Sequence, residues 1–175
     1  MKKTQYKIID NFLDQREFLI IQDLVMSSEL PYYYNCILTP EQLAEEKHKY
    51  DSYFTHLAYH SDKNNWVEGG SKTVFLKNFM PIVNKLKVAS LIRIKVNFYP
   101  RTEKMKIHAA HRDYPFDHNG ALFYINSCDG YTVLEDGTKI ESIANRVLIF
   151  NGGSLHSSTS CTNAQGRFNI NFNYF

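Results

Sequence analysis

The sequence has few cysteines, little net charge and no long apolar run. Its three cysteines, Cys36, Cys128 and Cys161, are odd in number and widely spaced, which indicates reduced thiols rather than a disulfide framework. A net charge of +2 over 175 residues is too small to predict nucleic-acid binding by itself. No apolar run is long enough to cross a bilayer, and none follows the basic start of the chain. We therefore expect a cytoplasmic protein with no secretory signal and no membrane partner.

Several catalytic motifs are also missing. His111-Arg112-Asp113 looks like the H-R-D loop of protein kinases, but that loop needs an asparagine five residues after its aspartate, where this chain has His118. The sequence contains no glycine-rich phosphate loop, no H-E-x-x-H and no cysteine cluster. A kinase is therefore excluded, and nothing supports a zinc hydrolase. Internal repeats and linkers are absent too, so residues 1–175 are expected to form one domain.

What the chain has in abundance is aromatic residues, 12 Tyr and 12 Phe, which favour β structure and can line a pocket. In the first half, Asp14 and Glu17 form a capping pattern before a helix that carries Phe18 and Ile21 on one face with Leu24 and Val25. The other elements expected there are strands at 6–9, 32–34 and 52–60, a helix starting at Thr39-Pro40, a loop over 62–71 and a helix over 71–86 that Pro81 starts or kinks.

The second half shows the period of two that is typical of strands. Residues 91–99 alternate apolar with polar side chains, and Asp136-Gly137 predicts a hairpin with a type I′ turn. Asn119-Gly120 predicts a turn before a strand over 121–125, and further strands are expected at 146–150 and 167–174. Short strands joined by glycine turns, with helices confined to the first half, predict a mostly β protein with a double-stranded β-helix (jelly-roll) core and flanking helices.

The stretch from Ile107 to Asp113 carries the strongest chemical signal. On an extended strand His111 and Asp113 point to the same side, whereas His108 points away. A third ligand must come from elsewhere, and His156 is the best candidate; His60 and His108 are expected not to be ligands. Two histidines and one carboxylate form the facial triad of non-haem Fe(II) oxygenases.

The last strand has a uniform polar face. Arg167, Asn169, Asn171 and Asn173 alternate with apolar residues from Phe168 to Tyr174. Such a face either meets water or lines a polar cavity, and an arginine in a cavity can bind a carboxylate with two parallel hydrogen bonds.

In this order, Asn97-Phe98-Tyr99, His111-Arg112-Asp113, His156 and Arg167-Phe168-Asn169 resemble the N-x-Y, H-x-D, H and R-x-N/S motifs of the Fe(II)/2-oxoglutarate-dependent dioxygenases. The matched region runs from Leu91 to Phe175, about half of the chain. The C-terminal motif is similar to the alkylation-repair branch, which has a second arginine where this chain has Asn173. The N-terminal layout is similar to prolyl-4-hydroxylase-like members, which more often have lysine in place of Arg167. The branch stays open.

The resemblance implies a set of roles. His111, Asp113 and His156 would bind Fe(II), Arg167 would bind the C5 carboxylate of 2-oxoglutarate, and Asn97, Tyr99 and Asn169 would complete the cosubstrate site. Dioxygen would be the second cosubstrate, with ascorbate as a candidate reductant. Residues 1–90 would supply helical support and the substrate mouth, and residues 91–175 the metal and cosubstrate core.

The resemblance predicts a hydroxylase, because chlorinating relatives have a small residue where Asp113 stands. The favoured substrate is a peptide or amino-acid side chain, a nucleobase is the alternative, and nucleic acid is not excluded as a partner. A different class also remains open, a cupin-type metal-binding jelly roll that acts as an isomerase or binding module without 2-oxoglutarate. Weaker candidates for substrate contact are Tyr114, Phe116, His118 and Tyr124, with Arg93 and Lys95 for an anionic group.

Overall fold

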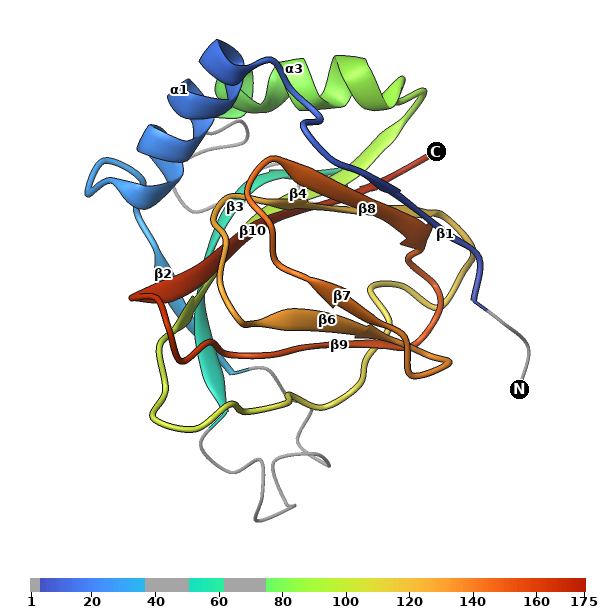
Figure 1. Cartoon of the computed structure of the whole chain (residues 1–175). Helices are drawn as coiled ribbons and strands as arrows, with labels where there is room; N and C mark the ends of the chain where they lie inside the picture. The colour runs from blue at the N-terminus through green and yellow to red at the C-terminus, as the bar shows by residue number, and fades with distance from the viewer. Residues whose placement is uncertain (1–3, 37–50, 62–74) are drawn as a thin grey trace.

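The computed structural model describes residues 4–36, 51–61 and 75–175, in which ten strands and two helices form three layers (Figure 1). Seven antiparallel strands make a large sheet in the order β1-β8-β5-β10-β4-β3-β2, and three make a small sheet in the order β7-β6-β9. The strands are β1 (Tyr6–Ile9), β2 (Tyr33–Cys36), β3 (Ser52–His60), β4 (Leu91–Pro100), β5 (Asn119–Tyr124), β6 (Tyr131–Leu134), β7 (Lys139–Glu141), β8 (Arg146–Asn151), β9 (His156–Ser158) and β10 (Gly166–Tyr174).

Helices α1 (Gln15–Met26) and α3 (Leu76–Leu86) lie on the face of the large sheet that points away from the small sheet (Figure 1). Helix α1 begins where the sequence predicts, since the Asp14 carboxylate accepts hydrogen bonds from the backbone N–H groups of Arg16 and Glu17, both at 3.0 Å. Pro81 lies inside α3 rather than at its start. The predicted jelly roll with helices outside it is confirmed.

The core lies between the helices and the large sheet. Phe18 and Ile21 of α1 pack with Ile94, Phe123 and Ile170 of the sheet in one buried cluster. Each such side chain contributes about 1.5–3 kcal/mol when removed from water, so this layer supplies most of the hydrophobic stabilisation. A smaller cluster fills part of the space between the two sheets; it comprises Leu122, Tyr124, Leu134, Ile140, Leu148 and Phe150.

Strands β4 and β10 pair along their whole length, with Asn97 opposite Asn169 and Tyr99 opposite Arg167. Because side chains alternate across a sheet, the apolar residues of both strands enter the core beneath the helices. Their polar residues face the space between the sheets and line a cavity there. The alternation read from the sequence thus predicts the inner and outer faces of both strands.

Two turn predictions are wrong in detail. Asn119 and Gly120 lie within β5, and a Cβ on Gly120 would come within 3.1 Å of the Gly152 Cα; the glycine allows a close backbone approach and does not form a turn. The hairpin at Asp136-Gly137 is present, but only Gly137 has a positive φ, of 86°, so the turn is not type I′. Asp136 instead accepts a hydrogen bond from the Thr138 N–H at 2.9 Å.

The segment that carries the H-x-D motif is extended but is not a strand of either sheet. It is tied to its surroundings by isolated bridges, from Ile107 to Thr159 and from His111 to His156. The first half of the chain also contributes more than support, because β1, β2 and β3 join the large sheet. The expected helix at Thr39-Pro40, the loop over 62–71 and the start of the helix over 71–86 lie outside the described residues.

None of the described helices is long and apolar enough to cross a membrane.

Asn145 offers a test of how the N-terminal segment is held. Its side chain accepts a hydrogen bond from the Leu13 N–H and donates one to the Leu13 carbonyl, both at 2.9 Å and both buried, and its φ is 60°. We expect Asn145→Ala to lower the free energy of unfolding by about 2–4 kcal/mol, because two buried backbone groups lose their partners. Urea denaturation measures the change.

The matched control is Asn11→Ala, at an exposed residue with a φ of 50° and no side-chain hydrogen bond among the described residues. Asn11→Ala measures only the cost of placing alanine at a positive φ, without the loss of a buried hydrogen bond. Equal losses in the two variants would show that the Leu13 bridge does not stabilise the protein.

Candidate metal centre

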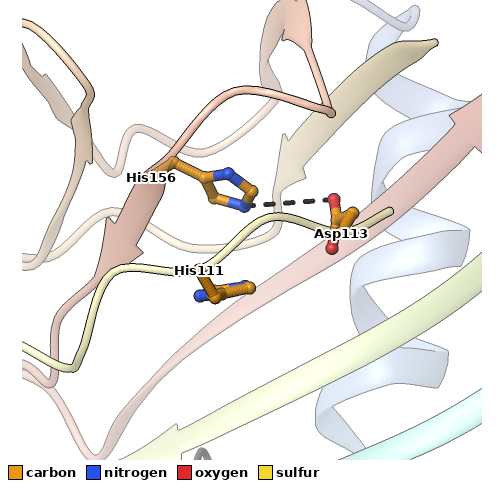
Figure 2. A group of neighbouring side chains, drawn as sticks. All are labelled: His111, Asp113 and His156. Atoms are coloured by element: carbon orange, nitrogen blue, oxygen red, sulfur yellow. Dashed lines mark ion pairs between the residues drawn. The ribbon is translucent and has the colours of Figure 1, made fainter. Parts of the chain in front are cut away.

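Two segments far apart in sequence bring the metal-ligand candidates together. His111 lies in the extended segment between β4 and β5, and His156 begins β9. Their backbones exchange hydrogen bonds in both directions, N to O at 2.9 and 3.0 Å, so the two imidazoles lie on neighbouring chains with ring centres 4.6 Å apart. Asp113 follows two residues after His111 and turns its carboxylate to the same place (Figure 2).

One ligand atom from each of these three residues lies within 4.8 Å of the other two. Nε2 of His156 is 3.9 Å from Oδ2 of Asp113, and both side chains are almost fully buried. Donor atoms at these separations can bind one ion between them. The three residues predicted from the sequence therefore form a compact group, and His108 is not part of it.

The protonation of the group suits a divalent metal. His156 Nδ1 lies 3.0 Å from the Ser154 carbonyl, which can only accept, so Nδ1 carries the proton and Nε2 keeps a free lone pair. Nδ1 of His111 is buried and has no hydrogen-bond partner among the described residues. Burial lowers the pKa of His111 to about 3 and also lowers the pKa of His156. Neutral imidazoles are the form that binds metal, so the donor set fits Fe(II).

Asp113 is held on both oxygens. Oδ1 accepts a hydrogen bond from Arg93 Nη2 at 2.6 Å, and Oδ2 accepts from the side-chain amides of Asn171 at 3.0 Å and Asn173 at 2.9 Å. Burial alone would raise the pKa of Asp113, but the Arg93 guanidinium and the amides hold it well below its usual range. The carboxylate is therefore charged and fixed in orientation.

Arg93 comes from β4, where it lies opposite Asn173 of β10. Its Nε donates to Asn173 Oδ1 at 3.0 Å, and its guanidinium lies 5.1 Å from the centre of the Tyr114 ring. The alkylation-repair pattern would have an arginine at position 173. Here a guanidinium reaches the carboxylate of the candidate ligand Asp113 from the neighbouring strand instead.

Arg167 lies at the other end of a cavity of about 150 Å³ that also contains the three ligand candidates. Its side chain is 0% exposed and donates to Ser142 Oγ at 2.6 Å, to Thr132 Oγ1 at 2.9 Å and to the Thr159 carbonyl at 3.3 Å. It forms no ion pair with a carboxylate of the described residues. A buried charge without a counter-ion is costly, so this site is suited to an anionic ligand.

The surroundings of Arg167 keep it in place. Its guanidinium lies between the rings of Tyr99 and Tyr124, at 5.5 and 5.6 Å from their centres. A Cβ on Gly130 would lie 2.6 Å from the Arg167 Cδ, so glycine leaves room for the arginine stem. Thr132 accepts hydrogen bonds from both Arg167 and the Tyr124 hydroxyl, which leaves its own proton for an acceptor in the cavity.

Asn97, Tyr99 and Asn169, the other predicted cosubstrate residues, line the same cavity. The Asn97 side chain donates to Asn169 Oδ1 at 2.9 Å, while no group in the described part of the chain hydrogen-bonds to its own buried Oδ1. The Tyr99 ring stacks on Tyr53 and on His108, each at 5.3 Å. The structure thus gathers these residues beside Arg167; Ser142 and Thr132, which hold it, carry no signal in the sequence.

The weaker candidates lie around the metal group. Tyr114 and Phe116 stack at 5.3 Å, and Tyr114 also contacts His60 through its hydroxyl at 3.2 Å. His118 Nε2 lies 3.0 Å from the Asn173 amide. Tyr124 is fully buried beneath Arg167, so it supports the arginine and does not face the mouth of the cavity.

No protein-family model and no curated protein matches the chain. Solved structures do match in fold. A prolyl hydroxylase from Trichoplax adhaerens, in complex with a hypoxia inducible factor peptide fragment, is 17% identical with a TM-score of 0.66, and the match covers 99% of this chain and 84% of that one.

A 2-oxoglutarate–Fe(II) oxygenase family oxidoreductase from Burkholderia pseudomallei is 11% identical with a TM-score of 0.68, covering 97% and 84% of the two chains. The α-ketoglutarate-dependent epimerase SnoN from nogalamycin biosynthesis is 11% identical with a TM-score of 0.62, covering 99% and 77%. The chain therefore has the fold of the 2-oxoglutarate–Fe(II) oxygenases, and the likeness in fold that the sequence motifs indicated is confirmed.

The geometry of the metal group yields a direct test. We expect His156→Ala to weaken Zn(II) or Fe(II) binding by more than about 100-fold. Loss of a metal ligand lowers the affinity more than loss of a residue that only hydrogen-bonds to a ligand. His60→Ala, at a nearby histidine outside the group, should leave the affinity unchanged. Calorimetric titration with the metal measures the affinity of both variants. Equal losses of affinity in the two variants would contradict this ligand assignment.

Proposed function

We propose that the protein is an Fe(II)- and 2-oxoglutarate-dependent dioxygenase that hydroxylates its substrate. One observation carries the proposal: a complete His-Asp-His group lines the same cavity as a buried arginine that has no carboxylate partner in the described part of the chain. A metal site alone would suit many proteins. The fold of the oxygenases supports the same reading.

In this proposal His111, Asp113 and His156 would hold Fe(II), and three protein ligands would leave the metal open to further ligands. Bound iron with 2-oxoglutarate and dioxygen supplies the oxidising chemistry. The protein supplies position. Arg167 binds the C5 carboxylate, the Thr132 hydroxyl can donate to the same group, and Asn97 with Asn169 lines the wall between Arg167 and the metal. The aromatic rings around Arg167 keep water out and strengthen its charge interaction.

Asp113 also bears on the outcome of the reaction. Both of its oxygens are held by Arg93, Asn171 and Asn173, so a halide would have to displace an anchored carboxylate. Transfer of a hydroxyl group is therefore favoured over halogenation. We propose a peptide or amino-acid side chain as the substrate, with a nucleobase as the alternative. A peptide is supported by the Trichoplax prolyl hydroxylase, which was solved with a peptide fragment.

The cupin alternative explains less of the cavity. A metal-binding jelly roll that does not use 2-oxoglutarate does not require a fully buried arginine such as Arg167 in the cavity of the metal group. An anion that binds beside that charge offsets the cost of burying it.

The test of the function needs no known substrate. We expect the purified protein with Fe(II), ascorbate and oxygen to convert 2-oxoglutarate slowly to succinate, because the metal and Arg167 together bind the cosubstrate. His111→Ala should form none, and His60→Ala should match the unmodified protein. Succinate is measured by mass spectrometry. Equal amounts from the unmodified protein and His111→Ala would favour the cupin alternative.

Arg167 has its own prediction. Arg167→Leu leaves the C5 carboxylate unpaired in a buried site, which costs on the order of 2–5 kcal/mol of binding. That is about thirtyfold to several thousandfold in affinity for 2-oxoglutarate. Anaerobic titration with Fe(II), followed by the visible charge-transfer band, measures it. Arg146→Leu is the control, since Arg146 pairs with Asp10 away from the cavity. Unchanged affinity in Arg167→Leu would remove the arginine from the cosubstrate site.

A further inference from the structure

The cavity holds more positive charge than the proposed cosubstrate requires. Among the described residues it is lined by four cations, Arg93, Lys95, Arg112 and Arg167, and by one carboxylate, Asp113. Arg112 is half-exposed at the rim and pairs with Glu135, so three cations face Asp113 inside the cavity. This leaves an excess of two positive charges. A divalent metal and the dianion 2-oxoglutarate cancel each other, so the excess remains after both have bound.

Lys95 is the cation for which no partner is assigned. Arg93 is paired with Asp113 at 2.6 Å, and Arg167 is expected to take the C5 carboxylate. The Lys95 ammonium lies 3.3 Å from the Tyr53 hydroxyl and 5.4 Å from the centre of that ring, and it forms no ion pair with a carboxylate of the described residues. A cation in this position keeps its capacity for an anion.

The position of Lys95 separates it from the cosubstrate end. It lies on β4 opposite Asn171, whose amide donates to the metal-ligand Asp113, whereas Arg167 lies opposite Tyr99. Lys95 and Tyr99 are four residues apart on one strand, which is about 13 Å between Cα atoms. Lys95 is therefore beside the metal, where a substrate must present the carbon that reacts.

We propose that Lys95 is a substrate-recognition residue and that the substrate carries a carboxylate, which binds the Lys95 ammonium beside the metal. This rests on the proposed function and names its substrate class: an amino acid, or a peptide with a free carboxylate near the reacting carbon. A single ammonium next to a tyrosine hydroxyl matches one carboxylate. Phosphate is more often bound by several N–H donors or an arginine fork.

Burial lowers the pKa of Lys95 to about 8, with further lowering from Arg93. An anion that binds there restores a favourable environment for the charge.

The experiment is saturation-transfer NMR on Zn(II)-loaded protein with 2-oxoglutarate in excess. Acetate is the carboxylate probe, acetamide is its neutral isostere and methyl phosphate is the competing oxyanion. We expect transfer to the acetate methyl group well above that to acetamide or methyl phosphate. Lys95→Met should weaken acetate binding by about tenfold, or about 1.4 kcal/mol. Arg112→Met, at a half-exposed arginine on the cavity rim that pairs with Glu135, is the matched control and should behave as the unmodified protein.

The outcomes separate the two proposals. Absence of transfer to 2-oxoglutarate itself would overturn the proposed function. If saturation is transferred to 2-oxoglutarate, but transfer to acetate is no stronger than transfer to acetamide, only the assignment of Lys95 is overturned. This comparison uses the unmodified protein and needs no variant. Stronger transfer to methyl phosphate would replace carboxylate by phosphate as the substrate class. Unchanged acetate binding in Lys95→Met would show that the carboxylate binds to a group other than Lys95.

Discussion

The antiparallel pairing of β4 with β10 is the constraint on which the rest of the cavity depends. Each strand alternates, so one register places apolar residues such as Ile94 and Ile170 under the helices and polar residues such as Lys95 and Asn169 between the sheets. A slip by one residue would exchange the two faces. That slip would bury the polar row among Phe79 and Ile82 of α3 and expose the apolar row to the cavity. The hydrophobic core and the candidate site are therefore specified by the same set of pairings.

Much of this could be predicted from the sequence because it depends on local periodicity. The alternation of β4 and β10 predicts which side chains face inward, and the i, i+2 spacing of His111 and Asp113 predicts that they share a side. The predictions fail where the role of a residue depends on a segment that is distant in the sequence. Gly120 was expected in a turn, yet it is small because Gly152 lies against it. Ser142 and Thr132 hold Arg167 from segments whose approach no local pattern indicates.

The solved structures that match this chain agree on its fold, but they do not select one branch of the oxygenases. That choice depends on the residues of the candidate site. Prolyl hydroxylases and an epimerase share the architecture at 11–17% identity, so the architecture does not choose between their reactions. Three of the cations that line the cavity with the candidate metal ligands are Arg93 on the Asp113 carboxylate, Arg167 hydrogen-bonded to neutral groups, and Lys95 beside the Tyr53 hydroxyl. In the proposed function these groups discriminate among substrates, since they are charged and the surrounding walls are largely desolvated.

Arg93 and Asn173 form a cross-strand pair in which the guanidinium comes from β4 and the amide from β10. Both side chains reach the same carboxylate, so the two positions are able to exchange their residues with little change in what Asp113 contacts. An exchange of this kind would move the arginine from β4 to β10 while a guanidinium and an amide still reach the same carboxylate. Compared one position at a time, two such chains would differ by one lost arginine and one gained arginine. The contact between Asp113 and a guanidinium is therefore a property of the facing pair of positions and not of either position alone.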